Sequence, residues 1–295
     1  MTSLSAAARG DFRCGYENAS AFDPQIADRI GLSFPQTHGD AAAMALLAVE
    51  VRKNSGGRVC SLPFCCTVEA EALGGRINLG DRENGPRVGE YVFESLEKLP
   101  DGLVELDFSR GRLREVLEAC RLLKSGGEHV SVEFSGPLTI LNGLMDISQV
   151  FKGWRKNEPL MREVLDRLGR EIFRYAAELK AAGTDILSFA DPTGAPNILG
   201  LRYSSMMAEL FLVPFLKKSE TLLDEETIMQ VCPRSSHMLT SQGLAEWASV
   251  DLGRPLSYDE GCLECRGKAK FLGQSCIKNK TFFLHDGKIQ TLRLK

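Results

Sequence analysis

Short apolar runs and longer amphipathic stretches alternate along the chain. The short runs have the length of buried strands, and the longer stretches repeat their apolar residues at helical spacing. The strand-like runs lie at 58–64, 130–134, 185–190 and 227–231. The helix-like stretches lie at 41–53, 112–123, 161–179 and 203–217. This alternation predicts an α/β fold with a parallel sheet and helices outside it, and it leaves open whether the sheet closes into a barrel.

The elements become short and irregular after about residue 239. Before that point the end signals are clear: Asp40 is placed to cap the first helix, and Gly56 with Gly57 ends it. The later strand-like runs lie at 246–251, at 268–273 and, alternating like a strand or a hairpin, at 281–295. Little room remains for a closing helix, so we expect an irregular C-terminus.

Composition narrows the class of protein. The chain has 295 residues, 43% of them hydrophobic, and a net charge of −3. No linker divides it, so we expect a single domain over residues 1–295, with neither nucleic acid nor membrane as a partner. The N-terminus has no apolar signal region and no run reaches the roughly 18–20 apolar residues of a membrane span, which favours a cytoplasmic protein.

Each of the four strand-like runs is followed by at least one acidic, thiol or small residue. In a parallel barrel, these positions display the functional groups. They are Cys65, Cys66 and Glu69 after the first run, Gly136 after the second, Asp191 after the third and Cys232 after the fourth. We predict catalytic roles for Asp191 and Glu69. The alternatives are a helix or turn cap for Asp191 and a solvated loop acid for Glu69.

Two further positions have both a functional and a structural interpretation. Gly136 precedes Pro137, so the amides that follow could bind an anion, or the segment could simply start a helix with proline at its first position. His38 lies just before a helix, where it could serve a site or the helix start.

The cysteines point to metal or thiol chemistry. Nine cysteines is an odd number, and it is high for a chain without a secretory signal. Four lie in the last third: Cys232, Cys262, Cys265 and Cys276, with a C-x-x-C at 262–265. We predict that a subset of these four binds zinc, with His237 as a substitute ligand. Three protein ligands would leave one position where a substrate thiol loses its proton, whereas four thiolates would make a closed structural site.

Five stretches, spanning roughly residues 30 to 240, resemble the uroporphyrinogen decarboxylase superfamily, and within it the methylcobamide:thiol methyltransferases. They are THGDAAAMALLAVEV from Thr37, PFCCTVEAEALGGRINLGD from Pro63, FSGPLTILNGLMD from Phe134, LKAAGTDILSFADPTGAPNILG from Leu179 and, as a weaker match, IMQVCPRSS from Ile228. The resemblance implies a TIM-type (β/α)8 barrel with a deep pocket at its C-terminal face. It also implies a partner corrinoid protein that presents methyl-cobalt to this pocket.

The resemblance also implies site residues. Methyltransferases of this family bind zinc through a His-x-Cys motif and a later cysteine. By position, Cys232 matches the first cysteine, and Asp191 and Glu69 match pocket acids. Gln230 stands at the histidine position, and we assign it to substrate binding with His38 and Gly136. Cys276 is the first choice for the later cysteine; Cys262 and Cys265 could compensate for the missing histidine.

We therefore predict a corrinoid-dependent methyltransferase that acts on a small acceptor or donor. A non-catalytic corrinoid- or metal-binding barrel is the first alternative, with Gln230 marking a lost site. A decarboxylase is disfavoured because the segment FRCGYENASAFDPQ at 12–25 lacks a recognisable arginine motif for a carboxylate-rich substrate.

Overall fold

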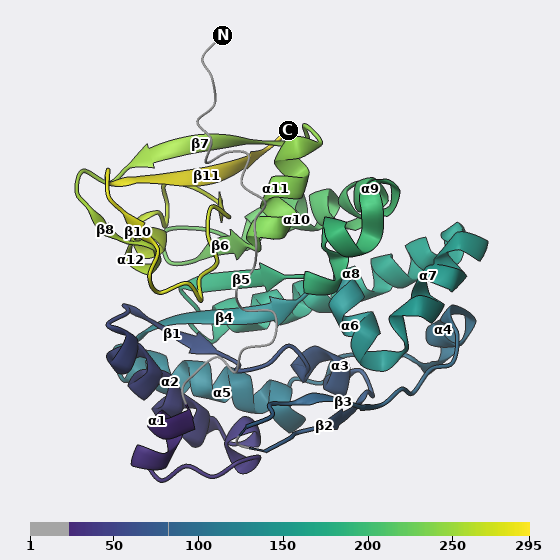
Figure 1. Ribbon diagram of the computed structural model, residues 1–295, viewed down its shortest axis with the longest axis horizontal. Helices are drawn as coiled ribbons and strands as arrows, with labels where there is room; N and C mark the ends of the chain where they lie inside the picture. Colours follow the sequence, from purple (N-terminus) through teal and green to yellow (C-terminus); the bar gives the residue numbers. More distant parts are fainter. Residues whose placement is uncertain (1–23, 82) are drawn as a thin grey trace.

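The computed structural model describes residues 24–81 and 83–295 (Figure 1). Cys14 and most of the segment 12–25 lie outside the described residues.

The main sheet has seven strands in the order β1-β4-β5-β6-β9-β11-β7 (Figure 1). Its parallel strands are β1 (Val59–Leu62), β4 (His129–Ser135), β5 (Ile186–Ala190), β6 (Ile228–Val231) and β9 (Phe271–Leu272). The antiparallel strands β11 (Lys288–Leu294) and β7 (Ala245–Asp251) complete it. Two small antiparallel pairs lie outside it: β2 (Arg76–Asn78) with β3 (Arg87–Glu90), and β8 (Leu256–Ser257) with β10 (Phe283–Leu284).

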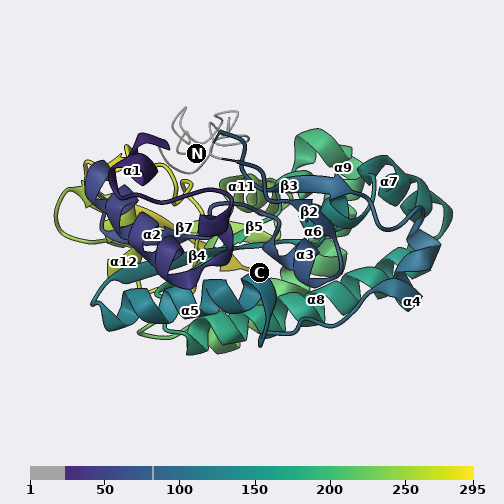
Figure 2. The same ribbon diagram turned by 90° about the horizontal axis from the view of Figure 1, so that it is seen from below.

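Long helices cover one face of the parallel strands, which we call the outer face (Figure 2). They are α2 (Ala41–Ser55), α5 (Gly111–Ser125) and α8 (Glu158–Ala181). The shorter helices are α1 (Pro24–Arg29), α3 (Val68–Ala72), α4 (Leu99–Gly102), α6 (Pro137–Leu144), α7 (Ile147–Lys156), α9 (Pro196–Met207), α10 (Val213–Ser219), α11 (Pro233–Ser241) and α12 (Tyr258–Glu264). Short turns of helix are η2 (Gln36–Gly39), η3 (Leu96–Lys98), η4 (Pro192–Gly194), the π-helical η5 (Ala208–Leu212) and η6 (Glu220–Leu222).

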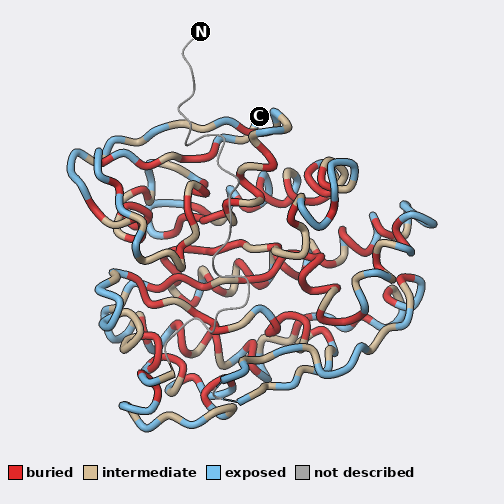
Figure 3. The backbone as a smooth tube through the Cα atoms, in the orientation of Figure 1, coloured by how far each residue is buried: buried red, intermediate tan, exposed pale blue. Residues whose placement is uncertain are grey.

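The strands divide their residues between two apolar clusters, because successive side chains point to opposite faces. On β4, Val130, Val132 and Phe134 join the outer cluster beneath the helices. On the opposite, inner face, Ile186 and Ile228 join a smaller inner cluster, whose other members include Val59, Tyr258, Cys262, Leu272 and Ile289. The parallel strands are therefore buried on both sides, as Figure 3 shows for β4, β5 and β6.

Residues 245–295, which we call the C-terminal module, cover the inner face. Helix α12 packs there through Tyr258 and Cys262. The Asp259 carboxylate accepts a hydrogen bond of 2.8 Å from the amide of Arg58 at the start of β1. The described strands have no pairing between β1 and β7, so the module joins the two ends of the sheet through α12 and its loops.

The predicted elements are largely confirmed. The parallel βα order expected of a TIM-type barrel is present from β1 to β9, and the expected irregularity lies in the C-terminal module. Asp40 caps α2 by accepting from the amide of Ala43 at 2.7 Å, and Gly56 ends the helix in the left-handed conformation with φ 68°. Residues 281–295 do contain strands, but they do not pair as a hairpin: β10 pairs with β8, while β11 pairs with β7 and β9.

Residues 196–222 form the one helical stretch in the described part of the chain that is long and apolar enough to cross a membrane by length and composition. Met207, Phe211 and Phe215 from this stretch pack into the outer cluster, as expected of a core helix. Gly200, with φ 69°, also interrupts α9. The expected cytoplasmic location stays a prediction.

Asp259 tests whether the contact between α12 and β1 stabilises the fold. Replacing Asp259 with Ala leaves the Arg58 amide without its acceptor, so we expect the free energy of unfolding to fall by about 1–3 kcal/mol. Chemical denaturation measures this change. The exposed Asp166 is the control, and its Ala variant should stay within about 0.5 kcal/mol of the parent. Equal stabilities of the two variants would contradict the proposed anchoring.

Candidate functional site

The carboxylate of Asp191 joins the end of β5 to the start of α6. Its Oδ1 accepts from the amide of Thr139 at 2.8 Å and from the hydroxyl of the same residue at 2.7 Å. Its Oδ2 accepts from the amide of Leu138 at 3.2 Å. These amides belong to the first turn of α6, whose unpaired N–H groups attract a negative charge. The anion site predicted at Gly136 therefore has an internal carboxylate on two of its amides.

Gly136 allows this approach. A Cβ atom at this position would lie 2.4 Å from the Cβ of Asp191, far inside van der Waals contact. The amide of Gly136 donates to the carbonyl of Ala190 at 2.8 Å, which extends the pairing of β4 and β5 into the turn. Pro137 occupies the first position of α6, as the sequence predicted. A glycine is thus required here by close packing rather than by an unusual backbone angle.

Burial gives Asp191 a titration range useful for proton transfer. Burial raises the pKa of Asp191 from 3.8 to about 6, although the hydrogen bonds from Thr139 and Leu138 oppose the shift. The residue borders a small cavity whose other walls are mainly apolar. They are formed by Phe189, Gly194, Met207, Phe211, Leu212, Ser235 and Met238. A carboxyl group with a pKa near neutrality can accept a proton from a group held in this cavity.

Glu69 contacts the end of β4, just before the turn into α6, and is buried. It is 3% exposed, and its Oε1 accepts from the amide of Ser135 at 2.8 Å. Burial raises the pKa of Glu69 above its ordinary value, against the effect of the Ser135 hydrogen bond. Glu69 is absent from the walls of the Asp191 cavity. This geometry supports a role in holding α3 against β4, while the predicted catalytic role stays a prediction.

His38 belongs to a buried cluster centred on Arg112, which the sequence analysis did not identify. The Arg112 guanidinium donates to the carbonyl of His38 at 3.1 Å, to Thr67 Oγ1 at 3.1 Å and to Glu71 Oε2 at 2.7 Å. It also donates to the sulfur of Cys65 at 2.6 Å. Burial, with the Arg112 charge, lowers the pKa of His38 to about 4. His38 is therefore neutral near pH 7 and sits in a cluster that joins η2, α3 and α5.

Gln230 is committed to a network on the inner face. Its Oε1 accepts from the hydroxyl of Ser188 at 2.9 Å. Its Nε2 donates to the carbonyls of Val231 and Ser275, both at 3.0 Å. The amide thus connects β5, β6 and the loop after β9, and both of its N–H groups are used.

The four cysteines predicted as metal ligands lie in different surroundings. Cys262 in α12 and Cys265, directly after its last residue, are buried within the inner cluster, and burial raises the pKa of Cys265 to about 11. Cys232 begins α11 after β6, and Cys276 follows β9. Across residues 24–81 and 83–295, no three or more His, Cys, Asp or Glu side chains are grouped to hold a metal ion. The predicted donor set therefore does not fit a zinc site in this arrangement.

An ion pair on the inner face was also missed. Lys278 donates to Glu133 Oε1 at 2.9 Å, linking the C-terminal module to the middle of β4. Burial alone would lower the pKa of Lys278, but the Glu133 carboxylate raises it above the ordinary value. The sequence signal was Glu133 itself, a charged residue inside the buried run 130–134. Such a residue calls for a partner of opposite charge.

Comparison with known proteins relates this site to others. A family model described as "Uroporphyrinogen decarboxylase (URO-D)" matches residues 21–243. The Methylcobamide:CoM methyltransferase MtaA of Methanosarcina barkeri (strain Fusaro / DSM 804) is 27% identical over 220 residues, which are 73% of this chain and 63% of the relative. The Methylcobamide:CoM methyltransferase MtbA of Methanosarcina acetivorans is 27% identical over 219 residues, which are 71% of this chain and 62% of the relative. The chain thus spans less than two thirds of these curated relatives.

A solved structure agrees with these matches. A methyltransferase from Methanosarcina mazei superposes with a TM-score of 0.64 and 25% sequence identity, over 80% of this chain and 71% of that chain. Together with the family match, this likeness confirms the TIM-barrel type of fold predicted from the sequence. The family match ends at residue 243, directly before β7, so the C-terminal module lies beyond it.

Gly136 tests the close approach of the β4–α6 turn to Asp191. We expect Gly136→Ala to lower the free energy of unfolding by about 1–3 kcal/mol, because the new methyl group overlaps Asp191. Gly39 is a suitable control, since a Cβ atom there meets nothing within 4 Å. A Gly136→Ala variant as stable as Gly39→Ala in urea would contradict this packing.

The raised pKa of Asp191 predicts a specific dependence of stability on pH. Its folded-state pKa of about 6 exceeds the ordinary 3.8, so the folded protein binds this proton more tightly than the unfolded chain does. The corresponding stabilisation is full below about pH 4 and is lost as the pH rises through 6. We therefore expect the free energy of unfolding of the parent, measured in urea from pH 4 to 7, to increase relative to that of Asp191→Asn as the pH falls. If the difference in free energy of unfolding between the two proteins stayed constant over this pH range, the raised pKa of Asp191 would be contradicted.

Proposed function

The chain belongs to the uroporphyrinogen decarboxylase family, and from this premise we propose that it transfers a methyl group between a corrinoid carried by a partner protein and a small acceptor or donor. The predicted family resemblance is confirmed by the match over residues 21–243. Relatives named as methylcobamide:CoM methyltransferases, and the methyltransferase with a TM-score of 0.64, support this choice of reaction.

The observation that carries the proposal is the free capacity of Asp191. Its Oδ1 already accepts two hydrogen bonds from Thr139, whereas its Oδ2 accepts a single one, from Leu138, and lies close to Gly194, whose backbone amide also stabilises the charged carboxylate. Because a carboxylate oxygen has two lone-pair directions, Oδ2 can accept one more proton or hydrogen bond. The cavity beside it has a volume of about 10 Å³, room for about one water-sized group, so only the thiol group of an acceptor would enter it.

In the proposed mechanism, Asp191 takes the proton of the acceptor thiol at Oδ2. The mainly apolar walls limit the water around the resulting thiolate, which keeps the sulfur nucleophilic. Its sulfur forms a bond to the methyl carbon, and the proton stays on Asp191 until solvent removes it. The partner's corrinoid would supply the methyl group and keep the electron pair of the broken cobalt–carbon bond. Thr139 and Leu138 hold the carboxylate in place throughout.

Zinc is not part of this mechanism, because the predicted ligands do not gather into a group of three among the described residues. The zinc prediction has a direct test in elemental analysis of the purified parent, Cys232→Ser and Cys276→Ser proteins. From the arrangement of the cysteines we expect well under one zinc per chain in all three. About one zinc per chain in the parent, lost in both variants, would overturn this expectation and restore the predicted site.

A second candidate function is a corrinoid-binding protein that performs no transfer. It is favoured by Gln230, whose two N–H groups both donate to backbone carbonyls and whose oxygen accepts from Ser188, at the position where the family resemblance expects a histidine ligand. Binding of methylcobalamin without protein-dependent demethylation would support this candidate over methyl transfer.

The test of the first candidate is transfer from free methylcobalamin to 2-mercaptoethanol, followed by the change in corrinoid absorbance. We expect Asp191→Asn to lower the rate at pH 7 by about 10²–10⁴-fold, the usual contribution of a general base. Asn keeps an acceptor oxygen for Thr139 but turns an N–H group toward the amide of Leu138, so the urea midpoint of the variant is measured together with its rate.

Asp166→Asn is the matched control, because it makes the same chemical change at an exposed position. Its transfer rate should equal that of the parent. If Asp191→Asn folds and transfers methyl groups at the parent's rate, Asp191 is not the base and serves only as the cap of α6.

A further inference from the structure

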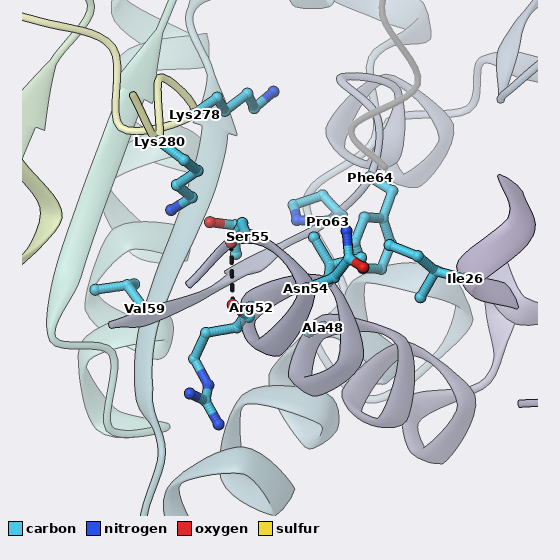
Figure 4. Close-up of a pocket in the computed structure, with 12 residues that line it drawn as sticks. Ile26, Ala48, Arg52, Asn54, Ser55, Val59, Pro63, Phe64, Lys278 and Lys280 are labelled. Carbon is cyan, nitrogen blue, oxygen red and sulfur yellow. Dashed lines mark hydrogen bonds between the residues drawn. The ribbon is translucent and has the colours of Figure 1, made fainter. Parts of the chain in front are cut away.

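A second cavity, lined by different residues from the first, lies along β1, which is an end strand of the sheet in the described part of the chain (Figure 4). We call it the β1 cavity; its volume is about 200 Å³. Its walls come from α1, from the C-terminal half of α2, from β1 and the residues after it, and from the loop that carries Lys278 and Lys280. It shares no residue with the cavity beside Asp191.

Three cations reach this cavity, and two of them have close carboxylate partners. Arg52 lies 2.9 Å from Glu128 Oε2, and Lys278 lies 2.9 Å from Glu133 Oε1. Their charges are thus balanced within the protein.

Lys280 is the exception. Its Nζ is buried and has no hydrogen-bond partner within residues 24–81 and 83–295. The nearest carboxylate, Asp259, is 3.8 Å away, beyond hydrogen-bond distance. The Asp259 oxygens already accept from the Arg58 amide at 2.8 Å and from the Ser257 hydroxyl at 2.6 Å. A buried ammonium with unused donors is costly unless something else accepts from it.

Two buried hydroxyl groups on β1 and β4 also have no hydrogen-bond partner in the described part of the chain. They are those of Ser61 and Ser131. Ser61 lines the cavity, and Ser131 is its register partner on β4, so both point to the inner face. The edge of the sheet therefore presents unused donors from β1, from β4 and from the C-terminal module.

We propose that the β1 cavity binds a small organic anion, a carboxylate with a short apolar tail. The carboxylate accepts from Lys280 and Ser61, which satisfies the buried ammonium. The tail lies against the apolar part of the wall. This part is formed by Ile26, Ala48, Val51, Val59, Pro63 and Phe64. Burial lowers the pKa of Lys280, although Asp259 opposes the shift, and a bound anion would restore the charged form.

Such a ligand would also fasten the sheet. β1 and Lys280 are more than two hundred residues apart in sequence, and the module that carries Lys280 lies beyond the family match. Binding would stabilise the junction between β1 and the C-terminal module, independently of any reaction at Asp191.

The test uses acetate, butyrate and hexanoate as probes, with affinities measured by isothermal titration at constant ionic strength on the parent chain, Lys280→Met, Ser61→Ala and Lys268→Met. Lys268 is exposed, so its variant controls for the loss of a positive charge. We expect saturable binding to the parent that tightens about fourfold for each added methylene, the value of burying a CH₂ group. Lys280→Met should weaken binding at least tenfold, and Ser61→Ala several-fold, while Lys268→Met binds as the parent does.

Several outcomes would overturn the proposal. No saturable binding to the parent would mean that water alone fills the cavity. If Lys268→Met weakened binding as much as Lys280→Met does, the effect would come from the net charge of the protein and not from this site. If inorganic phosphate bound and affinity did not rise from acetate to hexanoate, the ligand would have no apolar tail. If Lys280→Met fails to fold, Ser61→Ala still decides, because parent-like affinity in that variant contradicts the site.

Discussion

Asp191 Oδ1 lies 2.8 Å from the amide nitrogen of Thr139 and 2.7 Å from its hydroxyl oxygen, so one buried carboxylate joins the end of β5 to the first turn of α6. Three features of the candidate site follow from this contact. It requires a glycine at 136, since a Cβ atom there would lie 2.4 Å from Asp191. It supplies the negative charge that the start of α6 attracts. It also leaves Oδ2 able to contact a ligand, so the carboxylate that caps α6 could act as a base.

The C-terminal module connects β1 to the opposite end of the sheet without strand pairing to β1 in the described part of the chain. A closed barrel would pair its last strand with β1, but here the C-terminal module covers the inner face and reaches β1 through Asp259 and Arg58. Among residues 24–81 and 83–295, no strand pairs with β1 on that side. The β1 cavity and the unused donor of Lys280 lie at this edge. The family part of the chain and the part beyond it thus meet at a polar junction.

Local patterns in the sequence were sufficient for most of the parallel strands and their helices. Asp40 and Gly56 marked the ends of α2 because capping depends on residues within one turn. Arg112, Gln230 and Lys278 could not be assigned in this way. Their partners lie 45 residues away for Arg112 and Thr67, 42 for Gln230 and Ser188, and 145 for Lys278 and Glu133. The cysteines show the same limit: spacing suggested a metal site, whereas the fold places Cys262 and Cys265 in an apolar cluster.

The pH profile of kcat/KM for methyl transfer from methylcobalamin to 2-mercaptoethanol tests the central claim most directly. If Asp191 accepts the thiol proton, kcat/KM should fall about tenfold per pH unit below the pKa of this group, about 6. The same profile for Asp191→Asn should lack that break. A protein-dependent rate with no break near pH 6 in the parent, or no protein-dependent transfer at any pH, would contradict the account.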